Sequence, residues 1–110
     1  MRYRPLTRNK EFSRAYARGK AFVHPKLVMY VSKNRMGVTR VGITATKKIG
    51  NAVQRNRARR VIRAALHQIL PYQVGGLDLV FVARGQTTRC KSDEVLVAAK
   101  KLLKDAGLVG

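Results

Sequence analysis

The residues best suited to chemistry in this chain are the arginines between positions 55 and 63, because a guanidinium group binds a phosphate with two parallel hydrogen bonds. They belong to the stretch KKIGNAVQRNRARRVIR, residues 47–63, which holds seven Lys or Arg and no acid. Uncompensated like charges at helical spacing destabilise an isolated helix by about 0.2–0.5 kcal/mol per pair. A phosphate backbone would reverse that penalty, so the stretch predicts contact with nucleic acid.

A basic junction precedes the helical part of this stretch. Lys47 and Lys48 stand just ahead of Gly50 and Asn51, where the alternation of a strand gives way to the spacing of a helix. A helix N-terminus attracts anions, and a glycine lets the backbone approach them closely. The junction is a weak motif alone, but ahead of the arginines it predicts one continuous surface.

Aromatic side chains form a second candidate binding feature. Four of the seven Phe and Tyr residues are interleaved with basic residues near the N-terminus: Phe12, Tyr16, Phe22 and Tyr30. Bases of single-stranded nucleic acid stack on such rings, at about 1–3 kcal/mol per base. Core packing is an equally good interpretation of Phe12, whereas the hydroxyl groups of Tyr16 and Tyr30 favour an exposed cleft wall.

Groups for acid–base, nucleophilic or metal chemistry are scarce. His24 and His67 are the only histidines, Cys90 is the only cysteine, and none of them has the spacing of metal ligands. Asp78 lies in an apolar run with no acidic partner nearby in the sequence. The side chains of this protein are therefore poor candidates for bond cleavage, and Cys90 is interpreted as a spare thiol.

The balance of charge indicates a polyanionic partner. The chain carries 24 Lys and Arg against 5 Asp and Glu, a formal net charge of +19, and such self-repulsion opposes compaction. No acid lies between Glu11 and Asp78, so we expect the first three-quarters of the chain to meet the polyanion. No apolar run approaches the roughly 18 residues of a membrane span, and no apolar segment of a signal peptide follows the basic N-terminus. We expect no membrane partner and, given the lone cysteine, a reducing cytoplasmic location.

The length predicts one domain over residues 1–110, and local patterns predict the elements within it. Asn9 is expected to be the N-cap of a helix over about 9–18, which Gly19 closes. Two β-favouring runs follow, about 22–33 and 38–46, and they predict an antiparallel hairpin. In the second run Val41, Ile43 and Ala45 alternate with Gly42, Thr44 and Thr46, which predicts one buried face and one polar, open face.

A long helix is predicted over residues 51–70, ending before Pro71. Its apolar residues share one side at 100° per residue: Ala58, Val61, Ile62, Ala65, Leu66 and Ile69. A buried strand is expected over residues 77–84. A last helix follows, with Ser92 as its N-cap and Gly107 just past its end. The order αββαβα predicts an α+β two-layer sandwich.

Residues 40–66, RVGITATKKIGNAVQRNRARRVIRAAL, resemble the signature of the bacterial ribonuclease P protein subunit. The core of that signature reads Arg55-Asn56-Arg57 here, with Lys47-Lys48 upstream. NKEFSRAYARGK resembles the family's first helix, KLVMYVS its first long strand and GLDLVFVARG its third strand. The resemblance covers roughly residues 5–105, nearly the whole chain.

The resemblance implies a fold like the second domain of ribosomal protein S5, with a left-handed βαβ crossover in place of the usual right-handed one. It also implies a ribonucleoprotein endoribonuclease that removes the 5′ leader from precursor tRNA by hydrolysing one phosphodiester bond. The catalytic RNA subunit would carry the chemistry and hold most of the magnesium. The protein would bind that RNA and the leader, as a monomer in a 1:1 complex with the RNA.

Two binding surfaces follow from the resemblance, and neither contains a catalytic residue or a metal ligand. The arginine surface is expected to bind the RNA subunit and is defined as Lys47, Lys48, Asn51, Arg55, Asn56, Arg57, Arg59, Arg60 and Arg63. The aromatic cleft is expected to bind the single-stranded leader and is defined as Phe12, Tyr16, Tyr30, Thr44 and Thr46.

Three other classes of function fit parts of the sequence. A ribosomal protein or RNA chaperone would share the basic helix but does not call for the aromatic cleft. A DNA-binding regulator could place the helix in a major groove, although no helix-turn-helix spacing precedes it. A nuclease that acts without RNA is the poorest fit, because paired carboxylates are missing.

Overall fold

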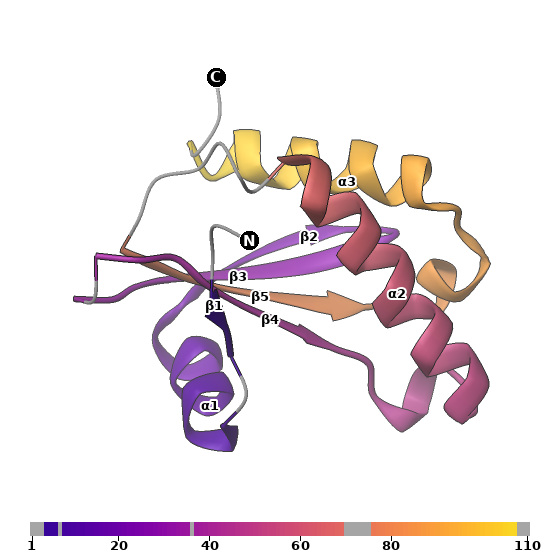
Figure 1. The fold of residues 1–110 in the computed structure, drawn as a ribbon, viewed down its shortest axis with the longest axis horizontal. Helices are drawn as coiled ribbons and strands as arrows, with labels where there is room; N and C mark the ends of the chain where they lie inside the picture. Colours follow the sequence, from indigo (N-terminus) through magenta and orange to yellow (C-terminus); the bar gives the residue numbers. More distant parts are fainter. Residues whose placement is uncertain (1–3, 7, 36, 70–75, 108–110) are drawn as a thin grey trace.

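Helices cover both faces of a single sheet in the computed structural model, which describes residues 4–6, 8–35, 37–69 and 76–107 (Figure 1). The strands are β1 (Arg4–Pro5), β2 (Lys20–His24), β3 (Leu27–Lys33), β4 (Arg40–Thr44) and β5 (Leu77–Ala83). The helices are α1 (Asn9–Arg18), α2 (Ala52–Ile69) and α3 (Ser92–Asp105), with short 3-10 turns η1 (Lys47–Ile49) and η3 (Gly85–Arg89). Within these ranges the strand order across the sheet is β1-β4-β5-β3-β2.

The pleat of the sheet separates two packing layers. Leu79 and Phe81 of β5 belong to the main core, into which α2 and α3 pack on one face of the sheet. Val80 belongs to a smaller cluster with Ala15 of α1 and Leu6 on the other face. Because alternate residues of a strand point to opposite faces, the mostly apolar sequence of β5 serves both layers. The predicted α+β sandwich with three helices on one sheet is confirmed, but α1 covers the face opposite α2 and α3, which the predicted two-layer arrangement did not include.

The prediction of one strand over residues 22–33 is wrong. Two strands lie there, β2 and β3, paired antiparallel with His24 opposite Leu27. Pro25 and Lys26 form the tight connection between them, and the Lys26 N–H donates to His24 Nδ1 at 3.1 Å. Proline has no N–H for a strand ladder, so the β-favouring run breaks at this position.

The predicted hairpin between the runs 22–33 and 38–46 is also wrong. β3 and β4 are separated by β5, which pairs antiparallel with β3 and parallel with β4. β5, which is apolar on both faces, lies at the centre of the sheet, where β3 and β4 pair with its two edges. The β4–α2–β5 unit is therefore a parallel crossover between adjacent strands, and its left hand stays a prediction.

The helix predictions are close, with changes at the caps. The N-cap of α1 is Arg8 and not the predicted Asn9, which is the first residue of the helix. In the same way, the N-cap of α3 is Lys91 and not the predicted Ser92. In both helices a glutamate three residues on accepts the N-cap N–H, so it caps the helix in place of the N-cap side chain. Gly107, at φ +76°, follows α3 as predicted.

α2 covers nearly the whole predicted range and is capped by its own sequence. The Gln54 N–H donates to Asn51 Oδ1, and the Asn51 N–H donates to Gln54 Oε1, both at 2.9 Å. This reciprocal pair is a capping box, which fixes where the helix begins. Of the predicted apolar stripe, all but the half-buried Val61 are buried. Leu70 and Pro71 lie outside the described residues.

Candidate nucleic-acid interface

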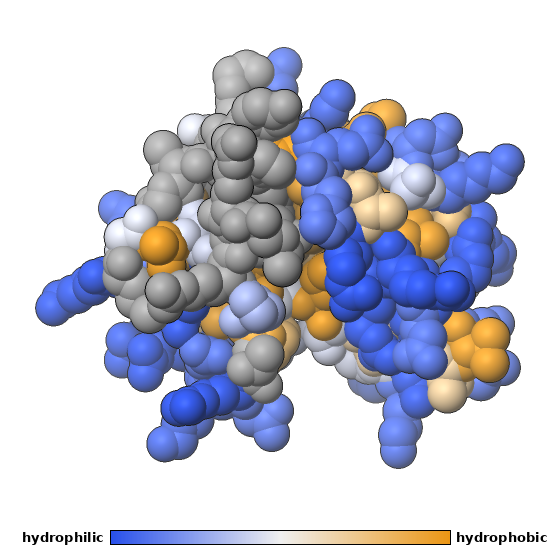
Figure 2. All heavy atoms as spheres, in the orientation of Figure 1, coloured by the Kyte–Doolittle hydropathy of each residue, from blue (hydrophilic) through white to orange (hydrophobic). Residues whose placement is uncertain are grey.

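The arginine surface lies on the side of α2 that faces away from the core. Ala58 and Ile62 are fully buried, so the charged side chains opposite them are held in place by the packing of the helix. Asn56, Arg60 and Arg63 are exposed there. The deepest hydrophilic colour in the space-filling view gathers over α2 (Figure 2). A shallow recess of about 510 Å³ follows these residues, lined by Val53, Asn56, Arg59, Arg60 and Arg63.

No acidic residue is present in α2 to relieve the repulsion between its arginines. Arg59 instead donates a short hydrogen bond to Asn56 Oδ1, one turn earlier on the same helix. The amide orients one guanidinium group without neutralising it. The surface therefore keeps its full positive charge, as a site for phosphate groups requires.

Arg55 and Arg57 contribute to the fold as well as to the charge. Arg55 Nη1 donates to the Gly50 carbonyl at 3.0 Å, which ties the first turn of α2 to the chain that enters it. Arg57 Nη1 donates to the Thr88 carbonyl at 2.7 Å, which ties α2 to η3. Both side chains are half-buried, and each keeps further N–H groups for a ligand.

The basic junction continues this surface at the start of α2. Lys47 and Lys48 are exposed on η1, directly before Gly50. Gly50 has φ +155°, and a Cβ there would lie 2.2 Å from Gln54 Oε1. Glycine is needed because a side chain would displace the amide that caps α2. Asn51 is exposed, but its side chain is occupied by the capping box.

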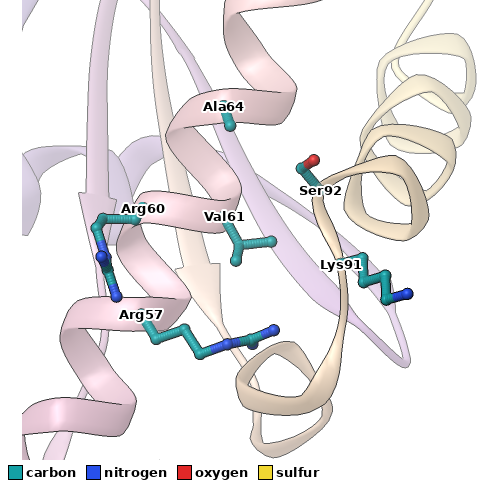
Figure 3. Close-up of a pocket in the computed structure, with 6 residues that line it drawn as sticks. All are labelled: Arg57, Arg60, Val61, Ala64, Lys91 and Ser92. Carbon is teal, nitrogen blue, oxygen red and sulfur yellow. The ribbon is translucent and has the colours of Figure 1, made fainter.

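A groove between α2 and the start of α3 adds a cation that the sequence analysis missed. Its volume is about 380 Å³, and its lining includes Arg57, Arg60 and Val61 of α2 and, from the facing segment, Lys91 and Ser92. Figure 3 shows Arg57 reaching from α2 toward η3, with Lys91 and Ser92 on the facing segment. Lys91 stands beside Asp93 and Glu94 in the sequence, so nothing local marks it as part of a basic surface.

The aromatic cleft lies on the other face of the sheet, between α1 and β4. Its recess of about 320 Å³ is lined by Asn9, Phe12, Ser13, Tyr16, Ile43 and Thr44. The rings of Tyr16 and Tyr30 meet edge to face, with centroids 4.9 Å apart and an interplanar angle of 75°. Such contacts fix ring orientation without covering the outer face of Tyr16, which is 42% exposed.

Tyr16 stays a neutral phenol at ordinary pH. Burial and the neighbouring Tyr30 raise the pKa of Tyr16, and a side-chain hydrogen bond with Thr44 opposes them only in part. A neutral ring carries no charge that would repel phosphate. The contact with Thr44 also links α1 to the end of β4, so the two walls of the cleft are joined.

Gly42 makes room for Phe12 in this layer. A Cβ at Gly42 would lie 2.5 Å from Phe12 Cε1, so any side chain there would push the ring aside. Phe22 and Thr46, in contrast, do not join the cleft. Phe22 packs against the main core on the opposite face of the sheet, and Thr46 is exposed at the N-cap of η1.

A buried ion pair fixes α1 against the sheet. Asp78 accepts from Arg40 Nε at 2.8 Å and from Nη2 at 2.7 Å, and Asn34 Nδ2 donates to Asp78 at 2.8 Å. Arg40 also binds Glu11 of α1. Burial alone would raise the pKa of Asp78, but the hydrogen bonds from Arg40 and Asn34 outweigh it and hold that pKa below its usual value.

Among the described residues, no group of three or more His, Cys, Asp or Glu is placed so that it could hold a metal ion. Cys90 is buried, and burial followed by the charge of Glu94 raises the pKa of its thiol. A protonated, covered thiol is inert, in keeping with a spare cysteine.

Among the described helices, none is long and apolar enough to cross a membrane.

Comparison with known proteins gives one consistent result. The family model described as ribonuclease P matches residues 1–107. The ribonuclease P protein component of Clostridium botulinum strain Loch Maree is 37% identical over 109 residues, covering 98% of this chain and 98% of the relative. That of Clostridium beijerinckii is 41% identical over 110 residues, covering 94% of this chain and 88% of the relative.

Solved structures agree with the sequence relatives. The ribonuclease P protein of Staphylococcus aureus aligns with a TM-score of 0.83 at 26% identity, covering 96% of this chain and 97% of that chain. The protein from Thermotoga maritima aligns with a TM-score of 0.79 at 26% identity, covering 92% and 96% of the two chains.

Proposed function

This chain belongs to the ribonuclease P protein family. We propose that it is the protein subunit of that endoribonuclease and that it assists in forming the 5′ ends of tRNA through two separate binding surfaces. The arginine surface binds the catalytic RNA subunit. The aromatic cleft binds the single-stranded 5′ leader of precursor tRNA. The protein is a monomer in a 1:1 complex with the RNA.

The observation that carries this proposal is the pairing of two chemically different surfaces on opposite faces of one sheet. The arginine surface offers guanidinium groups to phosphates, and the aromatic cleft offers a partly exposed ring to bases. A basic protein that only coats structured RNA has use for the first surface alone. A single-stranded segment explains the second, since unpaired bases can stack on Tyr16.

The protein assists cleavage without supplying a proton shuttle. Two RNAs that meet at a cleavage site repel each other, and a protein of net charge +19 lowers that repulsion. Magnesium, held by the RNA subunit, supplies the activation of water and the charge stabilisation of phosphodiester hydrolysis. The arginine surface holds the RNA subunit, and the aromatic cleft aligns the leader against it.

Stacking of the leader also separates substrate from product. Mature tRNA has no leader, so it cannot use the aromatic cleft. If part of the stacking energy survives the cost of ordering, a few bases favour the precursor by about 3 kcal/mol, or roughly a hundredfold.

Reconstitution tests this function directly. Purified protein is added to a bacterial ribonuclease P RNA at a magnesium concentration too low for the RNA alone, and precursor-tRNA cleavage is measured. We expect cleavage to be restored at the mature 5′ end. Binding to the RNA without restored cleavage would favour an RNA chaperone, and cleavage without added RNA would favour a protein nuclease.

A further inference from the structure

A basic recess lies on the flank of α1 opposite the aromatic cleft. Its volume is about 380 Å³, and four cations form its rim: Arg14, Arg18, Lys33 and Arg35. They come from α1, from the end of β3 and from the segment that follows β3, and all four are exposed. Because successive helix residues are about 100° apart, Arg14 and Arg18 point away from Phe12 and Tyr16.

The floor of the basic recess is one row of the sheet. Ser32 and Arg40 are both register partners of Asp78. The Asp78 side chain is 4% exposed and holds Arg40 in a bidentate pair, while Glu11 binds the same guanidinium group. The two nearby carboxylates are therefore already engaged beneath the rim.

The rim cations take no part in the ion pairs formed among the described residues. Arg14 acts on Asp78 only through longer-range attraction. The remaining acids of the chain, Asp93, Glu94 and Asp105, belong to α3 on the opposite face of the sheet. Five cations and one engaged carboxylate, Asp78, thus line one concave site, where like charges repel until an anion enters.

We propose that the basic recess binds the phosphodiester backbone of RNA, as a third contact beside the arginine surface and the aromatic cleft. This rests on the proposed function, in which RNA is the partner. Arg14 and Arg18 stand one turn apart, about 6 Å along the helix axis, so they engage successive phosphates of a strand. No aromatic side chain lines the basic recess within the described residues, so the contact reads no base.

The geometry favours the 5′ leader as the source of the RNA backbone that the basic recess binds. The aromatic cleft and the basic recess flank the same ten-residue helix, so a strand that leaves the cleft can pass α1 and reach the rim. A short leader would fill only the aromatic cleft. A longer leader would place additional phosphates against the rim.

A leader-length series tests the proposal in the reconstituted holoenzyme. Precursor tRNAs with leaders of about 4 and about 16 nucleotides span the range that single-strand-binding folds cover. Binding is measured against salt concentration for wild-type protein and for Arg14→Ala with Arg18→Ala. The matched control is Lys100→Ala with Lys104→Ala, which removes two exposed cations from α3. Lys33→Ala with Arg35→Ala repeats the test from the other side of the rim, without changing α1.

We expect the rim variants to bind the long-leader precursor about tenfold more weakly, with a salt slope about 0.7 smaller for each phosphate that the protein no longer neutralises. Unchanged binding of the short-leader precursor would identify the leader as the source. Equal weakening for every substrate, with weaker assembly on the catalytic RNA, would identify the RNA subunit. Effects no larger than those of the α3 control would overturn the proposal, while the proposed function would still stand on restored cleavage.

Discussion

Tyr16 shows at the scale of a single residue how this protein presents a base-binding surface. Tyr16 meets the Tyr30 ring edge to face and forms a side-chain hydrogen bond with Thr44, while the residue as a whole remains 42% exposed. A ring that is already oriented loses little rotamer freedom when a base stacks on it. The cost of ordering the aromatic cleft is therefore met when the protein folds.

Tyr16→Ala combined with Tyr30→Ala should weaken binding of precursor tRNA by up to about a hundredfold, because the stacking surface is removed. Binding of mature tRNA should not change. Affinities of the holoenzyme for both substrates measure the effect, with Tyr16→Phe as a control that keeps the ring. An equal decrease for the two substrates would show that the cleft does not hold the leader.

Gly42→Ala should weaken precursor binding severalfold, because the new Cβ displaces the Phe12 ring from the wall of the aromatic cleft. Gly85→Ala is the matched control, since a Cβ at Gly85 meets nothing within 4 Å. Precursor affinity and thermal unfolding are measured for both variants. If Gly42→Ala behaved like Gly85→Ala in both measurements, Phe12 would not shape the cleft.

At the scale of elements, α2 carries five arginines and no acid on a helix that its own sequence specifies. The capping box of Asn51 and Gln54 starts it, and residues such as Ala58 and Ile62 anchor it to the core. The helix is a rigid carrier for its arginines. RNA meets a fixed pattern of cations instead of a flexible basic tail.

Arg60→Ala with Arg63→Ala should weaken assembly with the catalytic RNA and flatten its salt dependence. The slope of log K against log salt should fall by about 0.7–0.9 for each phosphate that the helix no longer binds. Titration of the RNA subunit at several salt concentrations gives the slope, with Lys100→Ala and Lys104→Ala as the charge-matched control. A slope equal to that of the control would mean that the two arginines are only solvated.

The helices were predictable from the sequence because their signals are local. Helical spacing of Ala58, Ile62 and Leu66 lies within one segment, and the glycines after α1 and α3 mark their ends. The strand order was not predictable in this way, since β5 enters between β3 and β4 from a later part of the chain. Pairing over such separations leaves no periodic trace in either segment.

The candidate site was also predictable only where its residues lie close together in the sequence. The arginine surface follows from one helix, whereas the meeting of Tyr16 with Thr44 became visible only through the family resemblance and the fold. The pair of Arg40 and Asp78 was missed because its members are 38 positions apart. Each residue taken alone is a common basic or acidic side chain in a strand.

At the scale of the whole molecule, that pair connects parts of the fold that are distant in the chain. Asp78 of β5 holds Arg40 of β4 and Asn34 after β3, and Arg40 reaches Glu11 of α1. The side chains of Asp78 and Arg40 are 4% and 12% exposed. Removing the charge of Asp78 would leave the covered guanidinium of Arg40 with Glu11 as its ion-pair partner and without the bidentate contact.

Asp78→Asn should lower the free energy of unfolding at neutral pH by about 1–3 kcal/mol, because Arg40 loses its bidentate partner but keeps its ion pair with Glu11. The folded state holds the pKa of Asp78 below its unfolded value, so this stabilisation is present above the unfolded pKa of about 3.9 and is lost as the pH falls through the folded pKa. Urea unfolding between pH 3 and pH 7 measures both effects. Asp105→Asn, at an exposed pair with Lys101, should change little. Equal pH profiles for the wild type and Asp78→Asn would contradict the role of the ion pair.

The central position of β5 has a consequence for how the protein is made. β2 and β3 can pair early, and so can β1 and β4, but these two pairs cannot join into one sheet until Ala83 has left the ribosome, because β5 lies between them. By then the whole of α2 has emerged, with its arginines and without the complete sheet that later supports it. The nascent chain is thus a polycation before it is a folded domain, growing beside ribosomal RNA. Once β5 is complete, the sheet can form and hold α2, so that the arginines bind RNA as a fixed surface instead of as a flexible polycation.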